Sequence, residues 1–324
     1  MSNKLRQEEL QLFTNKHPFR QWKTWKIPQT DWTITGYSRS NDKTFFHIPQ
    51  LNCCIDAALC EGRQPEHVLL THTHSDHSAD IEYLASRDGG ASIYTPERAA
   101  SYVDAYIRAK RELNHNAVFR PELMDSIHIH GVKSGDTFSI GKKKEIEVEV
   151  FECIHKVPCV GFGFSQQKTR LKEEFQVKKD ELFAQNKQKE FGQWMASLHK
   201  DGVETKESYT QPLLAVLGDT HANVFDSTPS LFRYPVIMTE CTFLDDQERE
   251  RAEQNGHTLW SQLRPIVKAH PETLFMLTHF SLRHSDREVV AFFAQERQEH
   301  GLNNVMVWAH AESLLPELHQ AHSK

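Results

Sequence analysis

The chain has 324 residues, of which 38% are hydrophobic and 25% charged, with a net charge of −6. This length allows one large domain, and no apolar run approaches the roughly 20 residues of a transmembrane helix. The negative charge excludes nucleic-acid binding by bulk electrostatics alone. The polar first residues give no sign of a secretory signal, and six scattered cysteines predict neither a disulfide framework nor a cysteine zinc site. We therefore expect a cytoplasmic protein without membrane contact.

In chain order, short apolar segments alternate with charged, helical ones, which predicts an α/β fold. The expected strands are 52–56, 67–71, 92–95, 145–153, 213–217, 236–240, 274–278 and 305–309, and 137–153 should form a hairpin turning at Gly141 and three lysines. Residues 166–211 carry apolar positions at helical spacing, which predicts one or two amphipathic helices inserted between two strands. We expect a single domain, 1–324, with an aromatic and basic N-terminal extension over about 1–32, for which packing on the surface is the ordinary interpretation and a binding role the alternative.

The strongest chemical motif follows the apolar segment 68–70 and contains His72, His74, Asp76 and His77. Residues two apart on an extended segment face the same way, so His72 and His74 can converge on one ion. Asp76 and His77 lie further along and can face a second ion. Imidazole nitrogens and carboxylate oxygens are ligands that zinc accepts. Surface histidines in a polar loop would be the ordinary alternative, and the dense spacing disfavours it.

Three further candidates each follow a predicted strand, where sites of layered α/β proteins are usually built. They are His155, Asp219 and His279. We predict that His72, His74 and His155 bind one ion, that Asp76, His77 and His279 bind the other, and that Asp219 bridges both. The expected cofactors are two zinc ions, although manganese or iron could occupy such a mixed nitrogen and oxygen site. Such a pair can activate water and hold a phosphoryl group, which predicts phosphodiester hydrolysis with Asp76 accepting the proton of the water.

A leaving alkoxide needs a proton, and two residues outside the ligand set are suited to supply it. Glu240 ends a predicted strand and His257 follows a charged, helical stretch. We predict that His257 protonates the leaving oxygen while Glu240 orients it and raises its pKa. On residues alone, an equally good interpretation is that Glu240 caps the next helix and that His257 is exposed.

With these residues assembled, the chain resembles the metallo-β-lactamase superfamily, and within it the short-form ribonuclease Z enzymes that trim the 3′ trailer of precursor tRNA. The matching segments occur in the family's order: His72 to His77, His155 with the following GFGF, GDT at Asp219, Glu240 with His257, and HFSLR from His279. The resemblance implies an αβ/βα sandwich of four layers, with two mixed sheets flanked by helices. It also implies a homodimer, with Ser281 and Arg283 as candidates to contact the substrate phosphate.

Three functions are compatible with these residues. The first is a dinuclear metal-dependent endonuclease that removes the 3′ trailer of precursor tRNA. The second keeps the chemistry but acts on a small phosphodiester or cyclic nucleotide, and the third is a non-catalytic binding protein, which the complete ligand set disfavours. The lysines of the 166–211 insertion discriminate between the first two, because gripping phosphates needs uncompensated cations. In the sequence these lysines are interleaved with acidic residues, which is typical of a solvated helix face.

Overall fold

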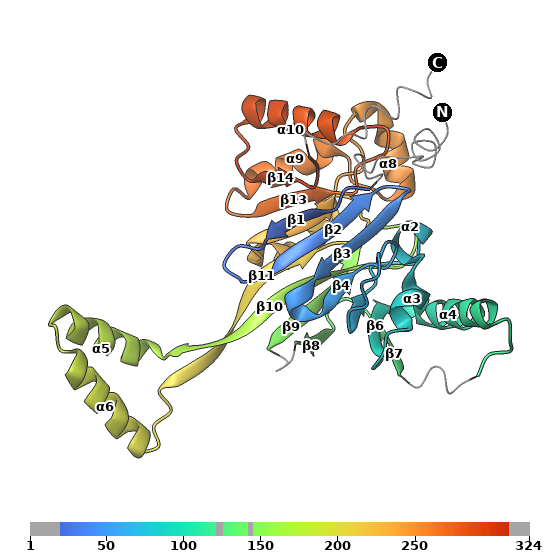
Figure 1. Cartoon of the computed structure of the whole chain (residues 1–324). Helices are drawn as coiled ribbons and strands as arrows, with labels where there is room; N and C mark the ends of the chain where they lie inside the picture. Colours follow the sequence, from blue (N-terminus) through green and yellow to red (C-terminus); the bar gives the residue numbers. More distant parts are fainter. Residues whose placement is uncertain (1–19, 121–125, 142–144, 311–324) are drawn as a thin grey trace, which may run out of the picture.

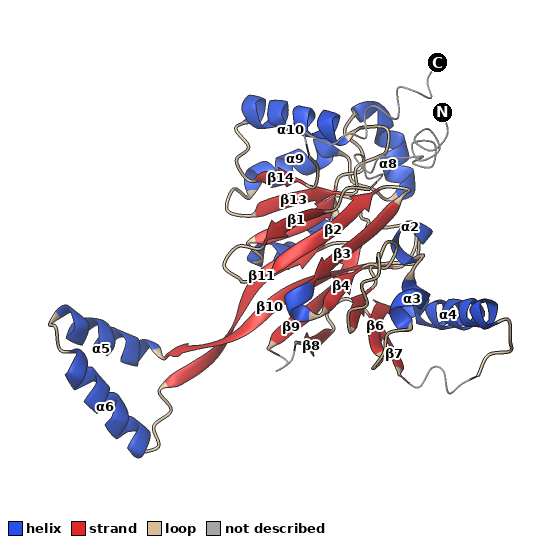
Figure 2. Cartoon of the chain, in the orientation of Figure 1, coloured by secondary structure: helices blue, strands red, loops and turns tan. Residues whose placement is uncertain are grey.

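The computed structural model describes residues 20–120, 126–141 and 145–310. Most of these residues belong to two seven-stranded sheets that pack face to face (Figures 1 and 2). The first sheet runs in chain order through β1 (Lys23–Lys26), β2 (Thr33–Arg39), β3 (Lys43–Ile48), β4 (Cys53–Ile55), β5 (His67–Leu69), β6 (Ala91–Pro96) and β7 (Ile127–Val132). The second sheet contains, from one edge to the other, β14 (Val305–Val307), β13 (Leu274–Thr278), β12 (Val236–Glu240), β11 (Lys206–Val216), β10 (Cys159–Leu171), β9 (Ile146–Cys153) and β8 (Thr137–Ile140).

Both sheets are mixed. Strands β1 to β4 pair antiparallel and β4 to β7 pair parallel, while β8 to β11 pair antiparallel and β11 to β14 parallel. Along each strand, successive side chains point to opposite faces of the sheet. In β3, Phe46 enters the core between the sheets, whereas Phe45 enters the core beneath the outer helices.

Helices cover the outer face of each sheet and complete four layers (Figure 2). The first sheet is covered by α3 (Ile81–Ala85) and α4 (Ala100–His115), the second by α7 (Val224–Ser227), α9 (Trp260–Ala269) and α10 (Asp286–His300). The other helices are α2 (Ser75–Ser78), α5 (Glu173–Ala184), α6 (Gln188–Lys200) and α8 (Arg249–Asn255), and the short 3-10 turns are η1 (Pro49–Leu51), η2 (Glu97–Ala99), η4 (Pro229–Arg233) and η5 (Asp246–Glu248). This arrangement confirms the predicted four-layer fold.

The two longest strands carry a segment away from the two sheets. Strand β10 pairs with β9 only as far as Gln166, but its pairing with β11 continues to Leu171. The resulting ribbon projects from the sheets and ends in α5 and α6 (Figure 1). These helices contact each other through aromatic side chains, with the Phe175 and Trp194 ring centroids 5.7 Å apart. We call residues 167–210 the arm. One or two helices are predicted for 166–211; two are present, and the strands on either side reach further into the segment than the sequence indicated.

Of two further predicted segments, the hairpin is present and the N-terminal extension differs from the prediction. The hairpin of β8 and β9 is confirmed, with Gly141 in a left-handed conformation, while the three lysines of its turn lie outside the described residues. Within the predicted N-terminal extension, 20–32, strand β1 pairs with β2 and extends the first sheet. Ile27 and Trp32 are buried in the core between the sheets. The segment 20–32 is therefore part of the first sheet, and the earlier aromatic and basic residues lie outside the described part of the chain.

Candidate active site

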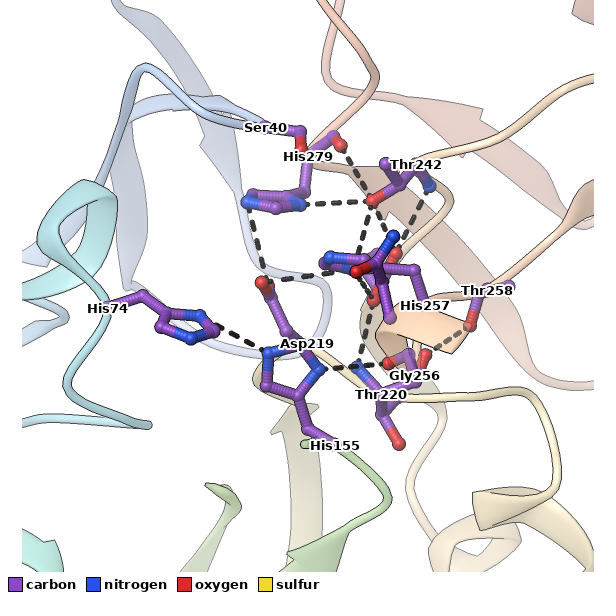
Figure 3. Close-up of polar contacts among 12 residues, drawn as sticks. Ser40, His74, His155, Asp219, Thr220, Thr242, Gly256, His257, Thr258 and His279 are labelled. Carbon is purple, nitrogen blue, oxygen red and sulfur yellow. Dashed lines mark hydrogen bonds and ion pairs between the residues drawn. The ribbon is translucent and has the colours of Figure 1, made fainter. Parts of the chain in front are cut away.

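The side chains predicted to bind metal lie together beyond the carboxyl ends of central strands from both sheets. They are His72, His74, Asp76 and His77 after β5, His155 after β9, Asp219 after β11 and His279 after β13. Parallel strands direct their carboxyl ends, and the loops that follow, to the same edge of a sheet. Packing two such sheets face to face brings the loops of both to one place, where Asp219 lies between His74 and His155 on one side and His279 on the other (Figure 3).

The first cluster is formed by His72, His74, His155 and Asp219. His74 Nδ1 lies 3.1 Å from His72 Nε2 and 3.3 Å from His155 Nε2. Asp219 Oδ2 lies 3.6 Å from His72 Nε2. Three imidazole nitrogens and a carboxylate oxygen thus converge on one point, which is a donor set that suits zinc.

The second cluster is formed by Asp76, His77 and His279, with the other oxygen of Asp219 beside them. The Nε2 atoms of His77 and His279 are 3.2 Å apart, and Asp219 Oδ1 lies 3.4 Å from the first and 3.6 Å from the second. Asp76 Oδ2 lies 3.6 Å from His279 Nε2. The two oxygens of Asp219 face different clusters, so the geometry groups the residues as the sequence predicted. Their roles as ligands stay predictions.

Four of the five clustered imidazoles have a hydrogen-bond partner on the outer nitrogen. These contacts join His72 Nδ1 to Thr71 Oγ1 (3.1 Å), His77 Nδ1 to Asp56 Oδ2 (2.7 Å), His155 Nδ1 to the Gly256 carbonyl (3.0 Å) and His279 Nδ1 to Thr242 Oγ1 (3.1 Å). A carboxylate or carbonyl partner places the proton on the outer nitrogen, and the inner nitrogen then offers its lone pair to the cluster. The residues present therefore fit bound metal ions.

In the first cluster, electrostatics favour the same neutral state of the imidazoles. Burial, together with the neighbouring imidazoles, lowers the pKa of His72 and of His74, and burial also lowers the pKa of His155. These imidazoles are neutral at pH 7 and can coordinate. Burial opposes ionisation of Asp219, but His279, His77 and His72 outweigh it and hold the pKa of Asp219 well below its usual range. The first cluster thus offers an ionised carboxylate beside neutral imidazoles, whereas in the second cluster Asp219 and Asp56 outweigh burial and raise the pKa of His77 well above its ordinary value.

Two groups around the clusters were not found from the sequence. Asp56 is 2% exposed and accepts hydrogen bonds from His77 through Oδ2 and from the Thr71 amide (2.9 Å) and hydroxyl (2.8 Å) through Oδ1. Because Thr71 in turn contacts His72, one carboxylate orients a histidine of each cluster. The Asn41 amide donates to Asp76 Oδ2 at 3.0 Å. A lone aspartate after an apolar strand, and a backbone amide, give no distinctive sequence pattern.

The backbone at two of these residues is left-handed. Asp56 has φ 61° and His279 has φ 58°. Residues other than glycine adopt this region at an energetic cost. In both cases the conformation brings the side chain against His77 from opposite sides.

Glu240 and His257 form a directly bonded pair beside the second cluster. His257 Nδ1 donates to Glu240 Oε1 at 2.7 Å, and Glu240 also accepts from the Thr220 amide (2.9 Å) and the Thr242 hydroxyl (2.5 Å). Glu240 is 2% exposed and ends β12, so it does not cap a helix, and the His257 side chain is 13% exposed. Burial opposes protonation, but Glu240 outweighs it and raises the pKa of His257 to about 9. His257 is therefore protonated at neutral pH.

A cavity of about 300 Å³ lies over the clusters, and His257 forms part of its wall. Ser40, Asn41 and Ser281 also line it. Arg39 supports the loop after His279 by donating to the Ser281 carbonyl at 2.8 Å.

Of the two residues proposed to contact substrate phosphate, Ser281 lines the cavity. Arg283 instead pairs with Glu248, its side chain is 57% exposed, and it is not among the lining residues. The role of Arg283 in phosphate binding stays a prediction, with Glu248 as a competitor for its guanidinium.

The fold and the site define the chain as a metallo-β-lactamase superfamily protein, a hydrolase of this fold with a candidate metal site of histidines and aspartates. The model of the beta-lactamase superfamily domain matches residues 51–172. The metallo-β-lactamase fold protein YhfI from Bacillus subtilis superposes with a TM-score of 0.51 at 13% identity, covering 84% of this chain and 93% of that protein.

Within the superfamily, the chain is distantly similar to ribonuclease Z. It is 27% identical over 267 residues to the chloroplastic tRNase Z TRZ2 of Arabidopsis thaliana, covering 80% of this chain and 70% of that one. It is 26% identical over 238 residues to ribonuclease Z of Pyrococcus horikoshii, covering 68% and 71%. In the part of the chain that the structure describes, no helix is long and apolar enough to cross a membrane.

Proposed function

We propose that this protein is a metal-dependent phosphodiesterase that removes the 3′ trailer of precursor tRNA. The observation that carries the proposal is the His257–Glu240 pair on the wall of the cavity over both clusters. Cleavage of a phosphodiester with a poor leaving group needs a proton donor that is still protonated at neutral pH, and this pair supplies one. The similarity to tRNase Z of Arabidopsis thaliana supports tRNA as the substrate.

In this proposal the proton transfers are divided between residues at the cavity and the groups that hold them. Glu240 holds Nδ1 of His257, so the imidazolium donates from Nε2 to the leaving oxygen. Asp76, held by the Asn41 amide, faces the cavity and accepts the proton of the attacking water. The Thr220 and Thr242 contacts fix the position of the Glu240 carboxylate. Proton acceptor and proton donor thus stand within one cavity.

Zinc, or else manganese or iron, would be held by His72, His74, His155 and Asp219 in the first cluster and by Asp76, His77 and His279 with Asp219 in the second. Bound there, the ions would supply Lewis-acid chemistry to the phosphoryl group and to water.

Two features of the arm favour different substrates. Its length favours a macromolecule, and its paired charges favour a small phosphodiester. Strand β10 has 13 residues, so at about 3.3 Å per residue the helices of the arm begin roughly 40 Å of strand length beyond Cys159. Such a reach serves a macromolecule, and we propose that in a homodimer the arm contacts tRNA bound at the partner subunit. The second candidate function, hydrolysis of a small phosphodiester or cyclic nucleotide, is favoured by the paired charges of the arm. Lys178 lies 3.3 Å from Glu181 and Lys187 lies 3.6 Å from Glu190.

We place this activity in the cytoplasm. The six cysteines are buried free thiols, which suits a reducing compartment.

The test compares a 3′-extended precursor tRNA with bis(p-nitrophenyl) phosphate, with and without a chelator. We expect chelator-sensitive cleavage of the tRNA at one position next to its discriminator base, and the His74→Ala variant should lose bound metal and activity together. Hydrolysis of the small diester while the tRNA stays uncleaved would exclude tRNA as the substrate and favour the second candidate. Cleavage that persists in the metal-free protein would contradict both.

A further inference from the structure

The cavity wall next to His257 carries two cations that have no role in the chemistry described so far. Lys156 follows His155 in the loop between β9 and β10, and Arg251 lies on α8, the helix that ends just before Gly256 and His257. Both line the metal cavity, as does Asn255 at the end of the same helix. Two segments that are about 95 residues apart in the chain thus place positive charge on the side of the cavity that holds the proton donor.

The ammonium of Lys156 is positioned without being neutralised. Its Nζ donates to Asn255 Oδ1 at 2.8 Å, and the neutral amide leaves two of its three N–H donors available. Within residues 20–120, 126–141 and 145–310, no carboxylate forms an ion pair with Lys156. The loop is also fixed at its base, because His155 Nδ1 donates to the Gly256 carbonyl at 3.0 Å.

The positive charge of Arg251 is likewise only partly compensated. Its Nη1 lies 3.8 Å from Glu248 Oε1, and that same oxygen is in closer contact with Arg283. One carboxylate therefore serves two guanidinium groups, each on a side chain about half exposed, and such a shared pair contributes little. In a chain with a net charge of −6, Lys156 and Arg251 make this wall of the cavity locally cationic.

We propose that Lys156 and Arg251 form a subsite for the phosphate that neighbours the scissile one on the leaving fragment of a nucleic-acid strand. The inference rests on the proposed function and deepens it. His257 protonates the leaving oxygen, so the leaving fragment must extend past His257, and α8 and the Lys156 loop form the wall on that side. A cationic wall there recognises a substrate with a second phosphate and gives no advantage to a single small diester.

The space next to Lys156 is consistent with a longer ligand. Lys156 and His155 also line an adjoining cavity of about 500 Å³, whose other lining residues include Arg98 and Lys133. Its carboxylates, Glu97 and Glu152, offset part of this charge, and Glu97 lies 3.8 Å from Lys133. A strand that leaves the metal cavity past Lys156 therefore enters a second hollow with cationic groups.

The test uses three substrates with one scissile bond: a dinucleoside monophosphate, and the same molecule with an added 5′ or 3′ terminal phosphate. The fragment that ends in a new hydroxyl identifies the leaving side. We expect the wild-type protein to prefer the form with a phosphate on that side by roughly tenfold to a hundredfold in kcat/KM. Lys156→Gln and Arg251→Gln should each reduce this preference, and Lys156→Arg should retain it.

The matched control is Arg249→Gln. Arg249 lies on the same helix, but it bonds to Asp246 and Ser261 and does not line the cavity, so the preference should equal that of the wild type. Two results would overturn the subsite but leave the proposed phosphodiesterase activity intact. One is a wild-type protein that cleaves the parent dinucleotide as well as the phosphorylated forms. The other is a preference for the added phosphate that persists in both Lys156→Gln and Arg251→Gln. A wild-type protein that cleaves none of the three, nor bis(p-nitrophenyl) phosphate, would refute the proposed function itself.

A binding measurement provides a second readout that does not depend on cleavage. The affinity of the metal-free protein for a labelled single-stranded oligoribonucleotide is measured against salt concentration. Loss of one phosphate contact should lower the slope of log affinity against log salt by about 0.7 for each substitution. An unchanged slope for both Lys156→Gln and Arg251→Gln would contradict the subsite.

Discussion

Replacement of Asp56 by asparagine tests whether one buried carboxylate orients ligands of both clusters. Asparagine has nearly the same shape and tolerates the left-handed backbone, so the change alters hydrogen bonding without adding strain. The amide can accept on one side only. If its oxygen keeps the Thr71 contacts, its NH₂ group meets the Nδ1–H of His77, donor against donor. His77 must then leave that proton unpaired or move it to Nε2, where it covers the lone pair that faces the cluster.

The magnitude follows from these contacts. Loss of an outer partner of a metal-binding histidine costs about 10- to 100-fold in metal affinity, which corresponds to about 1.4–2.8 kcal/mol. An unpaired buried donor would also lower the free energy of unfolding by about 1–3 kcal/mol. We therefore expect Asp56→Asn to fold, to melt at a lower temperature and to bind zinc at least tenfold more weakly.

Zinc affinity is measured by competition with a chelator, and stability by thermal unfolding of the metal-free protein. Asp136→Asn is the control, because among the described residues the Asp136 carboxylate accepts a side-chain hydrogen bond only from the Lys133 amide, in a turn away from the clusters. If Asp56→Asn bound zinc as tightly as the wild type while His77→Ala did not, the argument that Asp56 orients His77 would be wrong.

Two further predictions concern the proton donor. His257→Ala should keep its metal yet slow cleavage, most for diesters with poor leaving groups, as measured by kcat across a series of aryl and alkyl phosphodiesters; an equal loss for every leaving group would contradict acid catalysis. Because Glu240 raises the pKa of His257 to about 9, the protonated donor is lost as pH rises through about 9, and Glu240→Gln should move this high-pH limb of kcat toward the ordinary histidine value near 6.5; a limb at the same pH in both proteins would assign it to another group.

The sequence predicted the part of the site that is dense along the chain. His72, His74, Asp76 and His77 stand within six positions, so chain geometry alone brings them together. His155, Asp219 and His279 were predictable because each follows an apolar strand and the ends of such strands meet. The pairing of Glu240 with His257 depends on how α8 folds back beside β12, and no local pattern encodes it.

What the sequence did not predict depends on packing across the chain. Strand β10 contains Gly161 and Gly163, which are weak strand formers, and a β-carbon at Gly163 would lie 2.3 Å from the Tyr234 hydroxyl. These glycines are explained by close approach, which only the folded structure reveals. Strands β1 to β3 were missed because their polar residues hide the alternation, and Arg39 and Ser38 are buried there with partners elsewhere in the chain.

The left-handed backbone at Asp56 and His279 implies that the site is in conflict with the stability of the metal-free chain. Strain of this kind costs on the order of 1 kcal/mol per residue and persists because the surrounding structure enforces it. Glycine at position 279 would relieve this strain but would also remove a predicted ligand, so selection for stability alone would act against the site. Asp56 and His279 thus hold His77 between them at a cost in stability, a trade-off that is common where activity needs a fixed geometry.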